Sequence, residues 1–363
     1  MEQERAYWLA WSQISGVGPV TLKRIREHFS SMEEAWNAPR QAFWEIDGLG
    51  EKSSSAIASG RSRIQPEELL EKYLAKGFTF WTPADTNYPS LLLEIPSPPP
   101  VLYYRGQGDL LANRQAAIAI VGTRNATAYG KKWTQRISRA LTQHGFAIAS
   151  GMAAGIDTEA HQTCLAAGGK TIAVLGTGID VIYPRSNTHL YHRLCEQGLI
   201  LSDYPPGTPP EGKNFPPRNR IIAGVSRAIL VMEAARRSGA LITSRYANEF
   251  GRDVYTLPGS LDSPQSSGCL HLANQGAHLI LGEKELLEML GTIPQLDAKG
   301  QKSPPDLPPK LKQIWDSITP QPTPFDAIVQ DCGLPPGEVS GALLELELQG
   351  LVTQLPGMQY QRL

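Results

Sequence analysis

No stretch of the 363-residue sequence reaches the roughly 18 consecutive apolar residues that a membrane-spanning helix needs. The first residues, MEQERAYW, lack the basic start and apolar centre of a signal peptide. Cysteine is scarce, and Cys164, Cys195, Cys269 and Cys332 stand far apart without a Cys-x-x-Cys pair. This spacing disfavours a metal site or a disulfide framework. We therefore expect reduced thiols in a cytoplasmic protein with no membrane partner.

The sequence also lacks an excess of charge of one sign, because its formal net charge is −1. Overall charge thus points neither to nucleic acid nor to a membrane surface, and only local charge can indicate such a partner. Hydrophobic residues make up 41% and charged residues 19%, which is typical of a folded protein with a substantial core. The length predicts two or three domains.

Three motifs of nucleotide and ester chemistry are missing as well: Gly-x-Gly-x-x-Gly, Gly-x-x-x-x-Gly-Lys-[Ser/Thr] and Gly-x-Ser-x-Gly. Their absence disfavours nicotinamide binding, ATP hydrolysis by a P-loop and a hydrolase with a nucleophile elbow. Asp157 and His161 lie four residues apart on one predicted helix face, as an acid–base or metal pair would. No third ligand is evident nearby, so we favour an aspartate at a helix start that supports a packed histidine. We predict neither a metal nor a cofactor.

What the sequence does contain is a strand–helix–strand unit between Ala117 and His161. Ala117–Val121 has the apolar character of a buried parallel strand and runs into Gly122-Thr123-Arg124. A helical pattern follows, and then a second strand that ends at Ser150-Gly151. Ligands of open α/β sheets bind at the carboxyl ends of the strands, where helix N-termini attract phosphate.

Strands and helices alternate from there to about residue 281, which predicts a doubly wound parallel sheet. Residues 88–106, with their proline run, are expected to form a rigid, extended connector laid against this sheet. Charged, proline-rich sequence without apolar periodicity marks a later linker. We predict domains at residues 1–76 and 77–290, a linker at 291–309 and a last domain at 310–363.

The first domain contains the same pattern twice: two predicted helices joined by a Gly-x-Gly turn, at Gly16–Gly18 and again at Gly48–Gly50. This pattern resembles a tandem helix-hairpin-helix domain, whose glycine turns offer backbone amides to a DNA phosphate. The alternative is that the glycines merely cap helices in a small all-α domain. The acidic Asp47 and Glu51 beside the second turn leave both interpretations open.

The last domain contains three predicted helices and a short hairpin, an order that resembles a winged helix. A recognition helix that reads DNA should be basic. The segment Gly337–Gln349 instead carries three glutamates and no lysine or arginine. We therefore favour a protein-contact or regulatory module over a DNA reader.

Local positive charge is concentrated between Glu211 and Arg252, where eight lysines and arginines face three acids. If the sheet is parallel, this segment meets the turns after Val121 and Ala149 at one edge, and Arg236-Arg237 joins them. Cations and an aromatic ring in one groove are typical of a single-strand binding site. The alternative is scattered arginines that solvate a sheet edge. The predicted DNA-binding residues are Gly122, Thr123, Arg124, Ser150, Gly151, Lys213, Phe215, Arg218, Asn219, Arg220, Ser238 and Gly239.

Several motifs together resemble the DNA-processing protein A (DprA, or Smf) family of bacteria. They are Tyr88-Pro-Ser-Leu-Leu, Val121-Gly-Thr-Arg, Ser150-Gly-Met-Ala-Ala-Gly-Ile-Asp-Thr-Glu-Ala-His161, Phe215-Pro-Pro-Arg-Asn-Arg-Ile-Ile, Glu233-Ala with Ser238-Gly-Ala-Leu-Ile-Thr243, and Leu257-Pro-Gly-Ser260. The resemblance implies an extended Rossmann-like domain that binds single-stranded DNA and forms a homodimer. It also implies protection of incoming DNA and the loading of a RecA-type recombinase during natural transformation. By position, Arg124, Gly151, Phe215, Arg218, Asn219, Arg220 and Ser238 would line the DNA pocket.

No nucleophile–base pair or metal cluster demands catalysis, so we expect a non-enzymatic protein. The rival hypothesis is a nucleotide-processing hydrolase on a related sheet that uses Glu233 or Asp157. Such phosphoribohydrolases carry a Pro-Gly-Gly-x-Gly-Thr stretch with a following glutamate, which this sequence lacks. The segment Gly268–Gly282 is the candidate surface for homodimerisation.

Overall fold

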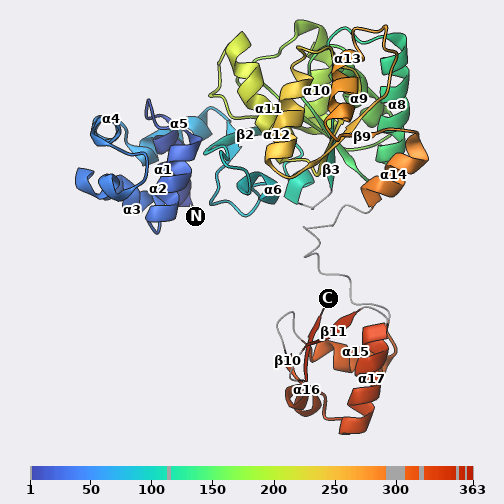
Figure 1. Ribbon diagram of the computed structural model, residues 1–363. Coiled ribbons are helices and arrows are strands. Elements are labelled where there is room, and N and C mark those ends of the chain that lie inside the picture. The colour runs from blue at the N-terminus through green and yellow to red at the C-terminus, as the bar shows by residue number, and fades with distance from the viewer. Residues whose placement is uncertain are drawn as a thin grey trace. The chain divides into compact units, whose positions relative to one another are not determined.

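The computed structural model describes residues 2–112, 116–291, 307–318, 323–348, 351–355 and 358–362. The chain divides into two compact units, residues 1–298 and 299–363 (Figure 1). The expected α/β architecture, with a helical N-terminal region and a small C-terminal domain, is confirmed. The finer boundary near residue 77 stays a prediction, because the helices and the sheet belong to one unit. Most of the predicted linker lies outside the described residues.

The N-terminal region consists of helices, and its two glycine turns join them as the pattern predicts. The elements are α1 (Glu2–Ser12), α2 (Pro19–His28), α3 (Met32–Asn37), the 3-10 helix η1 (Arg40–Glu45), α4 (Glu51–Arg61) and α5 (Pro66–Ala75). Gly16 and Gly48 occupy the left-handed region with φ of 82° and 80°, which favours glycine at both turns. Arg24 Nη1 donates a hydrogen bond of 2.7 Å to the carbonyl of Asp47. This contact favours a packing role for the second turn.

The central sheet has nine strands in the order β1-β2-β6-β5-β4-β3-β7-β8-β9. Strands β3 to β9 are mutually parallel. From β3 the chain first adds β4, β5 and β6 on one side and then β7, β8 and β9 on the other, so the winding direction reverses between β3 and β7. The strands are β1 (Thr79–Trp81), β2 (Leu102–Gly106), β3 (Ala117–Val121), β4 (Ala147–Ser150), β5 (Thr171–Val174), β6 (Leu199–Ser202), β7 (Ala228–Val231), β8 (Asp253–Thr256) and β9 (His278–Leu279).

Helices cover both faces of this sheet, as doubly wound folds require. On one face lie α6 (Ser90–Leu93), α11 (Phe215–Gly224), α12 (Ala240–Glu249) and α13 (Ser267–Asn274). On the other lie α8 (Ala128–Gln143), α9 (Ile156–Ala166), α10 (Thr188–Gln197) and α14 (Glu283–Gly291). The short elements α7 (Asp109–Ala112), η2 (Arg185–Asn187) and η3 (Gly212–Asn214) lie in the connections.

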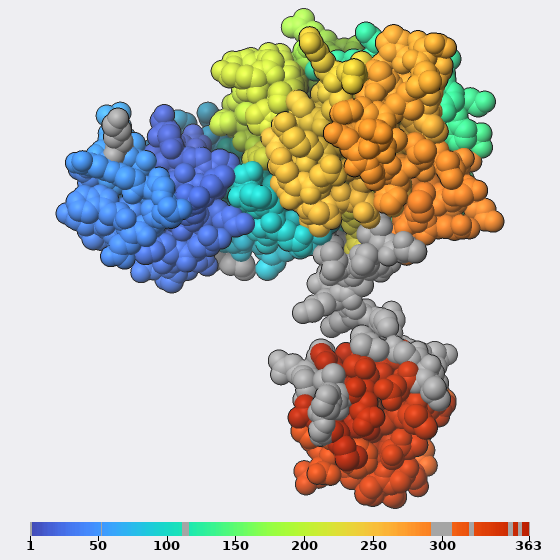
Figure 2. Space-filling view, viewed as in Figure 1, coloured from blue at the N-terminus to red at the C-terminus, as the bar shows by residue number. Residues whose placement is uncertain are grey.

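The expected connector of residues 88–106 ends as a strand of the sheet itself. Its last part is β2, which pairs antiparallel with β6, with Tyr103 opposite Ser202, and antiparallel with β1. Leu102 and Tyr103 are buried there, so these apolar residues extend the core past the edge of β6. The N-terminal helices continue it, because Leu9 and Leu70 pack with Tyr103. The space-filling view shows them in close contact with the segment around β2 (Figure 2).

The second unit has the predicted order of three helices and a hairpin. Its elements are α15 (Pro309–Asp316), β10 (Thr323–Pro324), α16 (Phe325–Cys332), α17 (Pro336–Leu348), β11 (Val352–Leu355) and β12 (Gln359–Arg362). It has its own core, in which Ile314, Ile328 and Leu343 are buried. The outer side of α17 exposes Glu338, Leu344 and Glu345. Because that surface is acidic and apolar, it supports the protein-contact interpretation.

All four cysteines are free thiols, and Cys195 alone among them is not fully buried. Within the described ranges, no helix is both long and apolar enough to cross a membrane. The same part of the chain holds no group of three or more His, Cys, Asp or Glu side chains arranged to bind a metal ion.

Candidate nucleic-acid interface

Two adjoining hollows lie at the carboxyl ends of β3, β4, β5 and β7, next to the point where the sheet winding reverses. The smaller, which we call the aromatic pocket, has a volume of about 150 Å³ and is lined by Arg124, Gly151, Gly176, Tyr183, Phe215, Arg218 and their neighbours. The larger, which we call the groove, has a volume of about 620 Å³ and is lined by Gly122, Arg124, Phe215, Arg218, Arg237, Ser238 and further residues. The two share Arg124, Ala153, Tyr183, Phe215 and Arg218. The predicted convergence of loops at one sheet edge is therefore present.

Glu233, which follows the neighbouring strand β7, fixes the turn after β3 through hydrogen bonds, and this turn presents Arg124 to both hollows. Thr123 N donates a 2.7 Å hydrogen bond to the backbone oxygen of Glu233, and the Glu233 carboxylate accepts from Thr127 N at 2.9 Å and Thr127 Oγ1 at 2.5 Å. A Cβ on Gly122 would lie 2.5 Å from Ile156 Cγ1, so the backbone needs glycine there. Arg124 is exposed at this fixed turn.

The turn after β4 is organised around a buried carboxylate. Asp157 Oδ2 accepts hydrogen bonds from Gly151 N at 3.1 Å and from Ala153 N at 3.3 Å. Burial raises the pKa of Asp157 to about 6, against the attraction of the Arg218 guanidinium. Because Asp157 already accepts from these two amides, they are not free for a phosphate, contrary to the expectation for this glycine turn.

Arg218 closes the floor of the aromatic pocket. Its Nη1 donates to the carbonyl of Gly151 at 3.1 Å and to the carbonyl of Val174. Burial lowers the pKa of Arg218 to about 10, although Asp157 favours its charged form. A Cβ on Gly151 would lie 2.8 Å from Arg218 Nη2 and 2.9 Å from Asp157 Oδ2, so a larger residue there would have to displace one of these groups.

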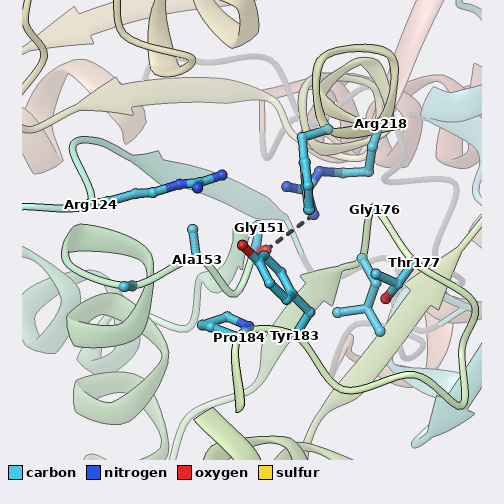
Figure 3. Close-up of a pocket in the computed structure, with 11 residues that line it drawn as sticks. Arg124, Gly151, Ala153, Gly176, Thr177, Tyr183, Pro184 and Arg218 are labelled. Atoms are coloured by element: carbon cyan, nitrogen blue, oxygen red, sulfur yellow. Dashed lines mark hydrogen bonds between the residues drawn. The ribbon is translucent and has the colours of Figure 1, made fainter. Parts of the chain in front are cut away.

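Two aromatic rings form one wall of the pocket, with arginines on either side. The ring centroids of Tyr183 and Phe215 are 5.4 Å apart at an interplanar angle of 35°. The Arg124 and Arg218 guanidinium carbons lie 5.6 Å and 5.9 Å from the Phe215 centroid, within cation–π range. Figure 3 shows Arg124 and Arg218 reaching from opposite sides toward the space beside Tyr183.

The start of α11 decides which of its arginines reach this site. The helix begins at Phe215, with prolines in its first turn. Phe215 and Arg218 therefore share a helix face, whereas Arg220 points elsewhere. Arg220 Nη1 forms a 2.8 Å ion pair with Asp203 Oδ2, and its Nε donates to the carbonyl of Ser97 at 3.1 Å. The expectation that Arg220 joins the pocket is wrong.

Two other expected residues do not line either hollow. Ser150 is fully buried, and its Oγ donates to the carbonyl of Ile120 at 2.6 Å. Lys213 is exposed next to Gly212 at the groove and pairs with Glu211 at 2.7 Å. The structure brings the remaining expected residues together around the two hollows: Gly122, Thr123, Arg124, Gly151, Phe215, Arg218, Asn219, Ser238 and Gly239.

Sequence analysis missed Tyr183 and Pro184, which line the pocket from the loop between β5 and α10. An aromatic residue soon after the Gly-x-Gly turn at the end of β5 was the available signal.

The expected support of His161 by Asp157 is also wrong. His161 Nδ1 is instead hydrogen-bonded to Thr171 Oγ1 at 2.7 Å, and burial lowers the pKa of His161 to about 3.

Comparison with known proteins agrees with this architecture. The family model for DNA recombination-mediator protein A matches residues 79–291, and the model for the DprA winged helix domain matches residues 298–358. The Protein Smf of Synechocystis is 49% identical over 99% of both chains.

Two solved structures are similar as well. The X-ray structure of DNA processing protein A from Streptococcus pneumoniae matches 79% of this chain and 97% of its own, with a TM-score of 0.69 and 35% identity. DNA processing protein A from Helicobacter pylori, a protein studied for its single-stranded DNA binding mode, matches 59% of this chain and 95% of its own, with a TM-score of 0.53 and 29% identity. The chain thus belongs to the DNA recombination-mediator protein A family, known as DprA or Smf.

Proposed function

We propose that this protein binds single-stranded DNA at the aromatic pocket and the groove. The observation that carries this proposal is the pair of rings, Tyr183 and Phe215, set between the Arg124 and Arg218 guanidinium groups. A cavity of about 150 Å³ accepts a single benzene ring in other proteins, so the pocket has room for about one base. Bases of a duplex are paired and stacked, and only an unpaired base can enter such a pocket without a large cost.

The cations around the site supply the attraction for the DNA backbone. Arg124 and Arg237 are exposed at the mouth of the groove. Single-strand sites combine such cations with rings on which bases stack, and this combination tolerates any sequence. The H. pylori relative's single-stranded DNA binding supports the same assignment here.

We propose a binding protein rather than an enzyme. The two carboxylates that a hydrolase would use are engaged in holding turns, Glu233 by Thr127 and Asp157 by the amides of Gly151 and Ala153. The rival hydrolase predicts turnover of nucleoside monophosphates by the purified protein. Steady release of base or phosphate, lost in Glu233→Gln, would support the rival.

From family membership we further propose that the protein protects incoming DNA and loads a RecA-type recombinase on it in the cytoplasm during natural transformation. Homodimerisation through Gly268–Gly282 is part of this proposal. Strand β9 lies at one edge of the sheet, and Leu279 and Leu281 expose 41% and 72% of their surface there. Exposed leucines beside an open strand edge are suited to pairing with a second copy. A clean monomer by light scattering at micromolar concentration would contradict this surface.

The decisive experiment is a titration of the full chain into fluorescent single-stranded and double-stranded oligonucleotides of one sequence at several salt concentrations. We expect tighter binding of the single strand and a linear fall of log K with log salt. Equal affinity for the duplex, or no binding of either, would refute the proposed function.

A further inference from the structure

A run of basic residues without carboxylate partners among the described ion pairs leads away from the aromatic pocket. The chain continues from Tyr183 and Pro184, which line the pocket, directly into η2 and α10. This run contains Arg185, His189, His192 and Arg193, and no acid occurs in the sequence from Arg185 to Arg193. Arg185, His189 and His192 are exposed and Arg193 is half-buried. Among the described ion pairs, none involves these side chains.

The spacing of these residues makes a continuous line. Arg185, His189 and Arg193 recur every four residues, which places them along one side of the helical segment. At 1.5 Å per residue the line is about 12 Å long. Phosphates along one strand of a duplex are spaced about 3.4 Å along the helix axis and are farther apart through space, so the line can meet about two more of them.

Helix α8 starts at the same sheet edge, and two of its four cations, Lys131 and Arg136, are paired with carboxylates. On α8, Lys131 lies 3.9 Å from Glu159 Oε1, and Arg136 forms a two-point ion pair with Glu283 at 2.6 Å and 2.7 Å. Such pairing lowers the positive potential that a phosphate meets. The run on η2 and α10 contains no such pairs among the described ion pairs, and it continues directly from Tyr183 and Pro184 at the pocket, so we favour it as the exit for a polyanion.

We propose that DNA leaving the aromatic pocket passes Tyr183 and follows η2 and α10, an additional binding site that we call the α10 track. Arg185 and Arg193, at the two ends of the line, would each contact a phosphate, and His189 between them would donate a hydrogen bond to the same backbone. The ligand of this track is the phosphodiester backbone of an unpaired strand, read without regard to base. This inference rests on the proposed function, because it extends the path of the same strand.

The test compares a short and a long strand. Wild-type protein and Arg185→Ala/Arg193→Ala are titrated with oligothymidylates of about 4 and about 16 nucleotides, the range of known single-strand sites. For the long strand we expect the variant to bind about five- to ten-fold more weakly. Its salt slope should fall by about 1.4, since each lost contact accounts for about 0.7. For the short strand, which fills only the pocket and the groove, the affinity should stay within about two-fold.

A matched control is the double variant Lys132→Ala/Arg139→Ala, which removes two exposed cations from α8. It should bind both strands as the wild type does, and thermal melts of both double variants should match the wild type because none of the changed side chains is buried in a core. Equal binding of the long strand by Arg185→Ala/Arg193→Ala, or an equal loss in the control, would overturn the α10 track while leaving the proposed function intact. If the wild type binds neither strand, the proposed function fails and the track with it.

Discussion

Replacement of Arg124 by alanine tests the centre of the proposed DNA site. Arg124 lines both hollows, lies 5.6 Å from the Phe215 centroid and has no carboxylate partner among the described ion pairs. Its removal eliminates one phosphate contact and one cation beside the stacking ring. We expect a loss of about 1 to 2 kcal/mol, or about five- to thirty-fold in Kd. The slope of log K against log salt should fall by about 0.7, because one fewer counterion is released.

The assay is fluorescence anisotropy with a labelled oligothymidylate at three or more salt concentrations. Arg139→Ala is the matched control, because it removes an exposed arginine from α8 well away from the carboxyl edge of the sheet. Charge reversal in Arg124→Glu should deepen the loss, since a carboxylate repels the phosphates. Unchanged Kd and slope for Arg124→Ala at low and moderate salt would exclude this arginine from the site.

Three further predictions concern other parts of the molecule. Phe215→Ala should weaken single-strand binding by about 1 to 3 kcal/mol without changing the salt slope, because a stacking ring carries no charge; a changed slope in the same titration would contradict this. Deletion of residues 300–363 should leave single-strand affinity within a few-fold, since the second unit has its own core and an acidic outer helix; a large loss would make that unit a DNA reader. His161 has its pKa lowered to about 3 by burial, so the stability it contributes is present above pH 6.5 and is lost as the pH falls toward 3. Chemical denaturation of the wild type and His161→Asn at pH 7 and pH 5 should therefore show their stability difference shrinking by about 2 kcal/mol toward pH 5, and a constant difference would refute this assignment.

Local patterns in the sequence were sufficient for the architecture and for the place of the site. Alternating apolar strands and amphipathic helices predict the parallel sheet, and parallel connections leave every strand's carboxyl end at one edge. The glycine turns after Val121 and Ser150 therefore had to meet there, together with Phe215 and Arg218. Both the pattern and the handedness of the connections are properties of short segments, which explains why they can be recognised without coordinates.

Only the tertiary structure shows which groups in the site are free to bind a ligand. Arg218 and Arg220 look equivalent in sequence, but Arg220 pairs with Asp203 and the carbonyl of Ser97, and the Gly151 amide is taken by Asp157. Tyr183 gains its importance from a ring 32 positions later in the chain. These partners are distant in sequence, and no local periodicity encodes them. Charge and aromatic content thus indicate the place of the proposed DNA site, whereas burial and pairing across the fold determine which side chains remain free there.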